Sequence, residues 1–470
     1  MNEPHQNKPK RVVRDTQGTE YELGERIGEG GQGVVYRTPY PGVLLKLSRR
    51  PLADARVQAW FSHVCWVARQ ALEGLHIASP VALIESKTNP GYVMEVMDGL
   101  EPLSKMLDRS MLGVQEAKGL GEYVSSGGVA RRVRVLAKLA RILADLHGRG
   151  LAYGDLSPSN VFISQSVDHE EVWLIDSDNI SISSREGGQK IYSPQFGAPE
   201  ILRGISGINS LTDSWSFAVL AFQLITLIHP FKGDIVEDDP DLEEPALRGE
   251  LPWVDHPENR RNACSGGRPR HELLTVRLYA LFEQCFNAGL DEPGERPSMA
   301  AWAEAFEAGV ALLAECDPER GCGSSFLFNP REECSFCGCP VPPAHHLLLR
   351  HAVFAPMAKL GEDATEADEW IPTPDFHFLQ ELRHVELRSA PVGTSNYASS
   401  PVVCRLHLDD TGLHVTPVSS RPLFLAKAKG GAPIRLSKPF LLKSEWQIGS
   451  TAALHIGDLA SVHTVWRFKW

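Results

Sequence analysis

The 470-residue sequence lacks the features of a membrane or nucleic-acid-binding protein. No uninterrupted apolar run reaches the ~18 residues that a membrane-spanning helix needs. The longest apolar stretch, from Trp215 to Phe231, contains Ser216, Gln223, Thr226 and His229 and predicts a buried core helix. There is also no basic excess, because 47 Lys and Arg residues face 59 Asp and Glu residues. We therefore expect neither a membrane nor a nucleic acid among the partners.

Composition divides the chain into zones. The first residues, Met1 to Asp15, are polar without the apolar run of a signal peptide, and we predict a disordered tail over residues 1–20. From residue 21 to 313, segments typical of strands and of helices alternate. Residues 314–343 are rich in Cys, Gly and Pro, and residues 344–470 show short alternating apolar runs split by turn residues. That last pattern predicts a β-rich domain, so we expect an α+β protein.

The nine cysteines do not fit a disulfide framework. Their number is odd, and five of them lie between residues 316 and 339, which favours a metal site in a reducing cytoplasm. Cys334 and Cys337 form a C-x-x-C knuckle, and Cys316 and Cys322 precede it. Four thiolates at these spacings suit a structural Zn²⁺, with Cys339 as a substitute for Cys337. The alternative is a set of reduced cysteines without metal.

A glycine-rich motif lies near the start of the second zone. Gly28, Gly30 and Gly33 form G-x-G-x-x-G, in which missing side chains let backbone N–H groups approach phosphates. The motif fits either a dinucleotide site or the phosphate-covering loop of a kinase. Because β-branched residues follow it, we predict a hairpin rather than a helix start. Lys46, in the apolar strand 43–47, either reaches the phosphates of a nucleotide or caps an edge strand.

Two further polar clusters follow a helix-like stretch from residue 131 to 147. Asp155 and Asn160 stand five residues apart before an apolar strand, a spacing at which the aspartate accepts a hydroxyl proton and the asparagine holds magnesium. Asp176 ends the next strand, 172–175, as a magnesium ligand should. Alone, Asp-x-x-x-x-Asn is more often a turn. The order of glycine loop, lysine, Asp/Asn pair and strand-end aspartate favours the catalytic interpretation.

From these motifs the chain resembles the protein kinase superfamily over residues 21–313. Gly197-Ala198-Pro199-Glu200 resembles the end of an activation segment, and Arg296 supplies the arginine that pairs with Glu200. Asp213 resembles the central-helix aspartate that braces the catalytic loop. The resemblance implies an N-lobe over 21–98, a C-lobe over 99–313, and a zinc-knuckle linker over 314–343 before the β-rich domain.

The same resemblance implies a site for ATP and Mg²⁺. The catalytic residues would be Lys46, Asp155, Asn160 and Asp176, with Asn160 and Asp176 holding magnesium. The strand 92–97 resembles the hinge, with Met94 as gatekeeper and the backbone of Glu95 and Met97 contacting adenine. The residues implied in nucleotide binding are Ile27, Gly28, Gly30, Gly33, Val35, Lys46, Met94, Glu95 and Met97.

Several positions depart from the usual kinase pattern. Tyr153-Gly154 replaces His-Arg, Ser157 replaces a lysine, and Asp176-Ser177-Asp178 replaces Asp-Phe-Gly. These forms resemble a bacterial subgroup of Ser/Thr kinases associated with a von Willebrand-type protein and a metal-dependent phosphatase, the tellurite-resistance-associated triad. The resemblance implies protein substrates and these two partners. Without the arginine, activation by phosphorylation of the loop that contains Ser181, Ser183, Ser184 and Tyr192 is not expected.

The acidic partner of Lys46 is not identified by the sequence. The helical stretch between Asp54 and Glu73 has no carboxylate, and those two residues are respectively too near and too far. Either the partner is unusual or the pair forms only on activation. One alternative is therefore a pseudokinase scaffold that binds nucleotide and presents its β-rich domain to partner proteins. Gly154-Asp155 also resembles small-molecule phosphotransferases of the aminoglycoside and choline type, which is the other.

The C-terminal domain resembles a forkhead-associated sandwich, through the turn Leu454-His455-Ile456-Gly457-Asp458. The arginine and serine expected to bind phosphothreonine are not identifiable. A degenerate partner-docking module and a plain structural β-domain both remain open. The histidines of this zone alternate with apolar residues and are predicted on strand surfaces: His407, His414, His455 and His463.

Overall fold

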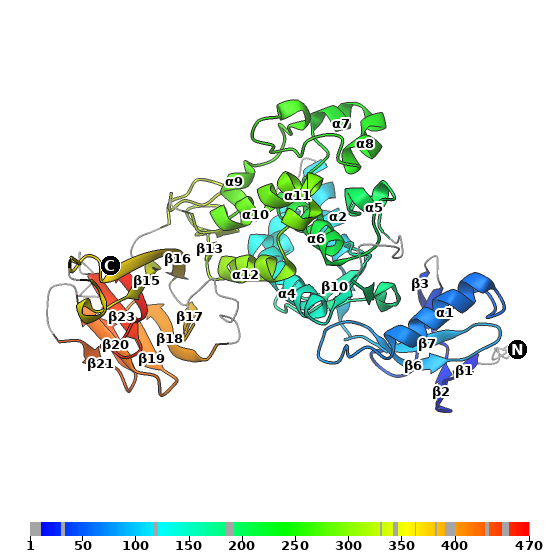
Figure 1. The fold of residues 1–470 in the computed structure, drawn as a ribbon, viewed down its shortest axis with the longest axis horizontal. Coiled ribbons are helices and arrows are strands. Elements are labelled where there is room, and N and C mark those ends of the chain that lie inside the picture. The colour runs from blue at the N-terminus through cyan, green and yellow to red at the C-terminus, as the bar shows by residue number, and fades with distance from the viewer. Residues whose placement is uncertain are drawn as a thin grey trace, which may run out of the picture. The chain divides into compact units, whose positions relative to one another are not determined.

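The protein is described from a computed structural model (Figure 1). It covers residues 11–29, 33–115, 121–183, 192–329, 331–341, 346–361, 363–380, 383–390, 400–427, 432–443 and 451–469. The chain forms two compact units. Unit 1 comprises Met1–Ser126, Lys138–Gly267 and Leu281–Met299, and unit 2 comprises Gly127–Ala137, Arg268–Ala280 and Ala300–Trp470.

A five-stranded antiparallel sheet, in the order β3-β4-β5-β7-β6, begins unit 1. Its strands are β3 (Arg26–Glu29), β4 (Val34–Arg37), β5 (Val43–Leu47), β6 (Pro80–Ile84) and β7 (Gly91–Glu95). The hairpin β3-β4 agrees with the prediction for the glycine motif. On β5, Leu45 and Leu47 enter one apolar cluster and Leu44 packs against another on the opposite face, so alternation along the strand serves two layers. Lys46, between Leu45 and Leu47 on this strand, is also buried.

The segment before this sheet corrects a prediction. β1 (Val12–Arg14) and β2 (Glu20–Glu22) pair antiparallel. The Asp15 carboxylate accepts hydrogen bonds from the backbone N–H groups of Gln17 and Thr19, which closes the turn between the strands. The disordered tail predicted for residues 1–20 is therefore wrong from residue 11 onward, and residues 1–10 lie outside the described part of the chain.

Helix α1 (Ala55–Val67) packs on one face of the five-stranded sheet (Figure 1). It begins at Asp54, whose side chain accepts a hydrogen bond from the Arg56 N–H, as an N-cap should. Val57, Phe61, Val64 and Val67 recur at helical spacing and are buried. The helix contains no Asp or Glu, so it provides no acidic partner for Lys46.

The rest of unit 1 is mostly helical around α6 (Ser210–Thr226), with residues 212–226 all buried. Asn209 and Thr212 form a reciprocal capping box at its start, and Leu227 ends it in the left-handed region. This confirms the buried core helix predicted within residues 215–231. In the described ranges, no helix is both long and apolar enough to cross a membrane.

The remaining helices are distributed over the two units. They are α2 (Leu103–Gln115), α3 (Gly121–Ser125), α4 (Gly128–Gly148), α5 (Pro199–Leu202), α7 (Asp234–Asp238), α8 (Glu243–Leu247), α9 (Arg270–Leu273), α10 (Val276–Phe286), α11 (Ala288–Asp291) and α12 (Met299–Val310). Short strands flank the segments that contain Asp155, Asn160 and Asp176. They are β8 (Leu100–Pro102), β9 (Leu151–Ala152), β10 (Val161–Ser164), β11 (Val172–Leu174) and β12 (Ser181–Ile182).

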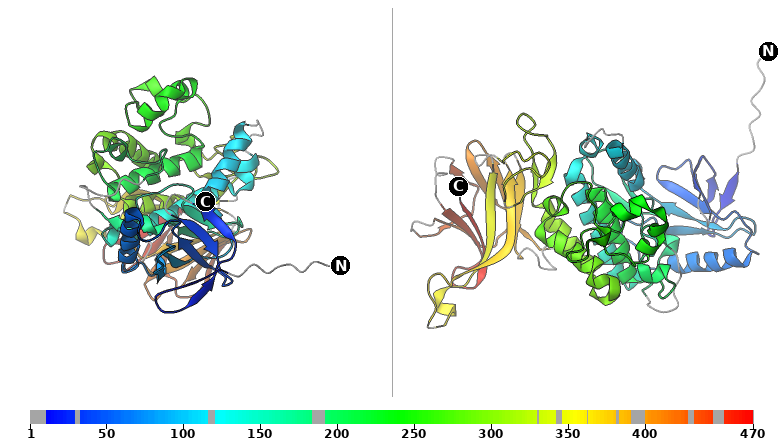
Figure 2. Two further views of the ribbon diagram at one scale, coloured as in Figure 1. Left: turned by 90° about the vertical axis from the view of Figure 1, so that its right-hand side faces the viewer. Right: turned by 90° about the horizontal axis from the view of Figure 1, so that it is seen from above.

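Unit 2 ends in a sandwich of two antiparallel sheets, coloured yellow to red in Figure 2. The six-stranded sheet has the order β16-β15-β24-β23-β20-β21 and the four-stranded sheet the order β17-β18-β19-β22. Leu349 and Leu454 from the first sheet and Leu413 from the second share one buried cluster, which confirms the predicted β-rich region. Before it, β13 (Leu313–Glu315) pairs with β14 (Ser325–Leu327).

The strands of the sandwich have the following bounds: β15 (His346–Phe354), β16 (Trp370–Gln380), β17 (His384–Arg388), β18 (Val402–Asp409), β19 (Gly412–Pro417), β20 (Leu423–Lys427), β21 (Ile434–Arg435), β22 (Phe440–Lys443), β23 (Thr451–Ile456) and β24 (His463–Lys469).

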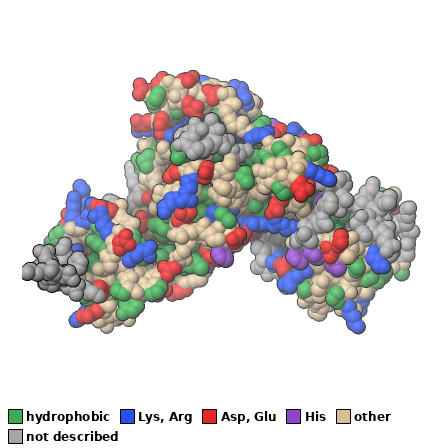
Figure 3. Space-filling view, turned by 180° about the vertical axis from the view of Figure 1, so that it is seen from behind, with side chains coloured by type: hydrophobic (Ala, Val, Ile, Leu, Met, Phe, Trp, Pro, Cys, Tyr) green, Lys and Arg blue, Asp and Glu red, His purple; other side chains and the backbone are tan. Residues whose placement is uncertain are grey.

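The histidines of this sandwich divide into two groups. His407 and His414 are cross-strand neighbours and partly exposed, as predicted. His455 and His463 instead bury all but 4% and 6% of their surface and hydrogen-bond to each other, so the surface prediction is wrong for them. Figure 3 shows one face of the molecule, on which charges of both signs are interspersed and histidines gather in one patch.

A buried ion pair fixes α5 against the helical core. The Arg296 guanidinium, whose side chain is 0% exposed, donates to both carboxylate oxygens of Glu200 at 2.7 and 2.9 Å. It also donates to the Gly289 and Leu211 carbonyls and lies over the Trp215 ring. The pairing predicted between Glu200 and Arg296 is thus present, and the guanidinium is shielded from solvent.

Replacing this arginine tests how far the pair stabilises the fold. We expect Arg296→Met to lower the free energy of unfolding by about 3–5 kcal/mol, because the Glu200 carboxylate stays buried without its partner. Chemical denaturation followed by circular dichroism measures the change. The double variant Glu200→Gln/Arg296→Met should recover part of the loss. A single variant within about 1 kcal/mol of the wild type would contradict this role.

Candidate active site

The Asp213 side chain, on α6, holds the loop between β9 and β10. Its Oδ2 accepts from the Tyr153 N–H at 2.6 Å and its Oδ1 from the Gly154 N–H at 2.8 Å. The His147 Nε2 lies 2.9 Å from Oδ2. Asp213 is 1% exposed, so these bonds satisfy a carboxylate that water cannot reach. The predicted brace on the catalytic loop is therefore present.

Asp155 and Asn160 lie side by side in this loop. The Asn160 Nδ2 donates to the Asp155 carbonyl at 2.9 Å, and its own carbonyl accepts from the Ile175 N–H at 3.0 Å, so the loop is tied to the end of β11. Because Nδ2 donates within the loop, the side-chain Oδ1 is the Asn160 atom with the chemistry of a cation ligand. Burial raises the pKa of Asp155 above its ordinary value, and the negative charge of Asp176 adds to the effect.

Ser193 also belongs to this cluster, although the sequence analysis did not select it. Its hydroxyl donates to Asp155 Oδ1 at 2.9 Å, opposing the effect of burial on the Asp155 pKa. The hydroxyl thus fixes one oxygen of the carboxylate and leaves the other toward Asn160. The only signal in the sequence was a hydroxyl residue five positions before Ala198, and that signal has little weight without a fold.

Gly154 explains why an arginine is missing from this loop. Its φ is +94°, which a residue with a side chain rarely adopts, and an added Cβ would lie 2.7 Å from Ile208 Cδ1. No larger residue fits there without rearrangement. The neighbouring Tyr153 is buried, and its hydroxyl donates to the Ile175 carbonyl.

Lys46 reaches two carboxylates after β11. Its Nζ lies 2.9 and 3.0 Å from the two Asp178 oxygens and 3.2 Å from Asp176 Oδ1. The partner that the sequence did not identify is therefore the unusual residue Asp178. Asp54 instead caps α1. The alternative that the ion pair is absent before activation does not apply to this structure.

The two carboxylates differ in their surroundings. The Asp178 side chain is 0% exposed, whereas 33% of the Asp176 side chain is exposed. Asp176 adopts φ = 55°, a left-handed conformation that is uncommon for aspartate. These nearby negative charges raise the pKa of Lys46 even though burial, the largest single effect, lowers it. Lys46 is thus a charged ammonium held between these two carboxylates.

The glycine loop is described only in part. Gly28 lies in β3 and Gly33 precedes β4, but Gly30 lies outside the described residues. An added Cβ on Gly33 would meet the Leu47 carbonyl at 2.6 Å, so a side chain there would push the loop from the sheet. Ile27 is exposed and Val35 half-buried at the start of the two paired strands.

The hinge strand is also present. Met94 is 3% exposed within β7, while Glu95 at the end of this strand and Met97 beyond it are exposed. The intervening Val96 N–H donates to the Gly42 carbonyl at 2.9 Å. This bond turns Val96 toward the sheet, so the flanking residues Glu95 and Met97 are the ones whose backbone can face a purine.

The segment after Asp178 contains the serines considered for phosphorylation. Ser181 lies in β12, paired with β9, and the Ser183 Oγ accepts from the Ser210 N–H at 3.1 Å. Ser184 lies outside the described residues. Tyr192 is 37% exposed. Ser181 is thus held through its backbone, and Ser183 through its hydroxyl.

The donor set at the loop fits a magnesium ion. Asn160 offers an amide oxygen and Asp176 a partly exposed carboxylate, and these are the hard oxygen ligands that Mg²⁺ prefers. Lys46 supplies a positive charge for phosphates nearby. The structure therefore brings Lys46 to Asp176 and Asp155 to Asn160. The backbone hydrogen bond from Ile175, the neighbour of Asp176, to Asn160 joins these two pairs.

A second cluster lies in unit 2. The Sγ atoms of Cys316, Cys322, Cys334 and Cys337 all lie within 4.8 Å of one another. Cys316 and Cys337 are 3.6 Å apart, and Cys322 and Cys334 are 3.7 Å apart. A tetrahedron with Zn–S bonds of about 2.3 Å has S···S edges of about 3.8 Å, so the four thiols fit zinc.

The protonation of these thiols is uneven. Although burial acts to raise it, hydrogen bonds with Ser324 lower the pKa of Cys322 to about 7. Burial raises the pKa of Cys334 to about 11. Cys339 is not part of the cluster, since its Sγ points to the Pro340 carbonyl at 3.8 Å. All nine cysteines are free of disulfides.

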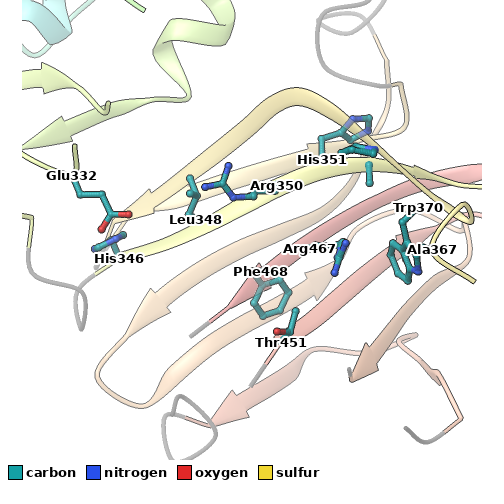
Figure 4. A pocket seen from close by; sticks show the side chains of 12 residues that line it. Glu332, His346, Leu348, Arg350, His351, Ala367, Trp370, Thr451, Arg467 and Phe468 are labelled. Carbon is teal, nitrogen blue, oxygen red and sulfur yellow. The ribbon is translucent and has the colours of Figure 1, made fainter. Parts of the chain in front are cut away.

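A groove of about 1010 Å³ lies on the six-stranded sheet (Figure 4). Its lining includes Arg350 and Arg467, which are cross-strand neighbours on β15 and β24, together with Trp370. The Arg467 guanidinium lies 4.7 Å from the Trp370 ring centre. None of the residues predicted for nucleotide binding or catalysis lies in this groove.

Comparison with known proteins agrees with this geometry. Residues 21–248 match the model of the protein kinase domain. Serine/threonine-protein kinase pkn3 of Myxococcus xanthus is 25% identical over 340 residues, which cover 68% of this chain and 55% of that protein. Serine/threonine-protein kinase PknD of Chlamydia caviae is 27% identical over 236 residues, covering 45% of this chain and 25% of that protein.

The chain thus spans about half the length of the first relative and a quarter of the second. The matched range contains the glycine motif, Lys46, the catalytic loop and Asp213. The chain therefore carries a protein kinase domain, similar to those of bacterial serine/threonine-protein kinases.

Proposed function

We propose that this protein is an ATP-dependent serine/threonine protein kinase that transfers the γ-phosphoryl group to hydroxyls of partner proteins. The observation that carries the proposal is a network of two hydrogen-bonded pairs, Lys46–Asp176 and Asp155–Asn160. The backbone hydrogen bond from Ile175 to Asn160 joins the two pairs. The kinase-domain match over residues 21–248 and the names of the relatives support the proposal. Phosphoryl transfer needs mainly positioning and charge stabilisation, which this network provides.

Each side chain has a separate part in the proposed reaction. Asp155, oriented by the Ser193 hydroxyl, accepts the proton of the attacking hydroxyl. Lys46 orients the α- and β-phosphates, and Asn160 and Asp176 hold magnesium. Magnesium, when bound, neutralises charge on the phosphates. The glycines at 28, 30 and 33 cover the phosphates, while Ile27, Val35, Met94, Glu95 and Met97 enclose the base.

A pseudokinase scaffold is the first alternative. It is favoured by the absence of a carboxylate on α1 and by Ser157, which stands where kinases have a lysine. A small-molecule phosphotransferase is the second alternative, suggested by Gly154-Asp155. The buried pair Glu200–Arg296 argues against it, because that brace is a protein-kinase feature.

The finer assignment of the protein belongs to the same proposal. The departures at Tyr153-Gly154, Ser157 and Asp178 support the bacterial subgroup associated with a von Willebrand-type protein and a metal-dependent phosphatase, which we propose as partners in the cytoplasm. The residues around Gly154 leave no room for an arginine that would bind a phosphorylated loop. The sandwich supports a forkhead-associated-like domain.

We propose a structural Zn²⁺ at Cys316, Cys322, Cys334 and Cys337. The pairwise spacing of their sulfur atoms supports this assignment. Around this segment β13 pairs with β14, and the knuckle itself has few apolar residues, so a metal would supply stability that a core does not.

Replacing the proposed base separates the candidate functions. We expect Asp155→Asn to reduce phosphate transfer from radiolabelled ATP to protein by at least about a hundredfold, because the proton acceptor is lost. Asp168→Asn, at an exposed carboxylate in the loop between β10 and β11, is the matched control. Equal signal from wild type and Asp155→Asn would favour the scaffold. Label found only on aminoglycosides or choline-like alcohols would favour the small-molecule enzyme.

Metal analysis of the purified chain tests the zinc site. We expect about one equivalent of zinc in the wild type and less than half in Cys334→Ser, since a structural site needs all four ligands. Cys339→Ser should retain the metal, because its sulfur lies outside the cluster. Less than half an equivalent in the wild type, or loss of zinc from Cys339→Ser, would contradict the assignment.

A further inference from the structure

Asp178 is a fully buried carboxylate with four donor contacts. Its Oδ1 accepts from Lys46 Nζ at 2.9 Å and lies 3.4 Å from the Tyr92 hydroxyl. Its Oδ2 accepts from Lys46 at 3.0 Å and from the Trp60 indole Nε1 at 2.7 Å. A charge removed from water persists only with such partners, so this carboxylate is built into the interior rather than directed toward a ligand.

Helix α1 reaches the segment after β11 through two side chains. The Trp60 indole donates to Asp178, and the His63 Nε2 lies 2.9 Å from the Ile180 carbonyl. Both residues lie on one face of α1, since they are three positions apart. The helix has no carboxylate that could contact Lys46 directly. Asp178 contacts both Lys46 and Trp60, so it links the lysine to the helix.

The two carboxylates that contact Lys46 are therefore not equivalent. Asp178 is enclosed by β5, β7 and α1, whereas Asp176 is one-third exposed and makes a single 3.2 Å contact with Lys46. The two oxygens of Asp178 already compensate the charge of the Lys46 ammonium, so the contact with Asp176 is not required for this. The exposed carboxylate is then available for a cation.

We propose that Asp178 is a positioning residue that holds Lys46 in place, couples it to α1 through the Trp60 indole, and so leaves Asp176 free to bind magnesium. The proposal rests on the proposed function for the role of magnesium. The coupling itself does not depend on turnover, and a pseudokinase that binds Mg²⁺ and nucleotide would contain it as well.

The variant Asp178→Asn removes the charge and keeps the side-chain volume. Lys46 then has Asp176 as its remaining charged partner, so magnesium must compete with the ammonium for that carboxylate. We expect the Mg²⁺ concentration at half-maximal binding of a non-hydrolysable ATP analogue to rise about fivefold or more. Binding of the analogue is followed by calorimetry at fixed protein and increasing Mg²⁺.

A spectroscopic signature tests the contact with α1 without any nucleotide. In ¹⁵N-labelled protein, the Trp60 indole resonance is assigned by its loss in Trp60→Phe. We expect that resonance to shift upfield in Asp178→Asn, because an amide accepts a weaker hydrogen bond than a carboxylate. Asp176→Asn should leave it in place. A general loss of stability would instead change the indole resonances of all the tryptophans, not that of Trp60 alone.

Two tryptophans on the same helix provide a matched pair. Trp60→Phe removes the donor to Asp178 and should change the Mg²⁺ midpoint in the same direction as Asp178→Asn, but less. Trp66→Phe makes the same substitution and keeps the ring that stacks on His63, so it should leave the midpoint unchanged. If Asp178→Asn fails to fold, Trp60→Phe against Trp66→Phe still decides the question.

The outcomes distinguish this proposal from the enzyme assignment. An unchanged Mg²⁺ midpoint in both Asp178→Asn and Trp60→Phe, or an unmoved Trp60 indole resonance in Asp178→Asn, would overturn the coupling. If the wild type transfers no phosphate but the variants still change the Mg²⁺ midpoint and the Trp60 resonance as expected, the enzyme assignment is overturned. The coupling is then still supported.

Discussion

The buried ion pair between Lys46 and Asp178 is the interaction on which the arrangement of the site depends. It joins strand β5 to the segment after β11, and the Trp60 indole extends it to α1. Removing two charges from water is costly, and the cost is offset only when geometry and further hydrogen bonds are good. Here all four contacts fall on one carboxylate, so the position of the lysine, the helix and the strand end are set together.

Much of the fold follows from local patterns in the sequence. The apolar strand predicted at 43–47, the apolar run within 215–231 and the short split runs after residue 344 correspond to β5, α6 and the sandwich. The hairpin β1-β2 was missed because its strands have three residues each and are largely exposed, so they carry no apolar period. Likewise, nothing local distinguishes the buried His455 from the partly exposed His407.

The candidate site was predictable where its residues have fixed spacing along the chain. Asp155, Asn160 and Asp176 belong to one loop and the next strand end, so their proximity is nearly local. Asp178 and Ser193 were missed for a physical reason: their partners are Lys46, far along the chain, and Asp155, reached across a returning segment. A search for the partner of Lys46 on α1 had to fail because the helix donates a hydrogen bond there instead of accepting one.

Gly154 and Asp178 change how such a site can be organised. With Cβ space at residue 154 occupied by Ile208 and the Asn179 carbonyl, the catalytic loop has no arginine that could bind a phosphate on the following segment. The loop is held instead by Asp213, and the lysine by Asp178, which follows Asp176 by two positions. Under the proposed function, the order of the site then depends on contacts internal to the folded domain. Asp178 contributes by occupying the ammonium of Lys46, which would otherwise compete with magnesium for Asp176.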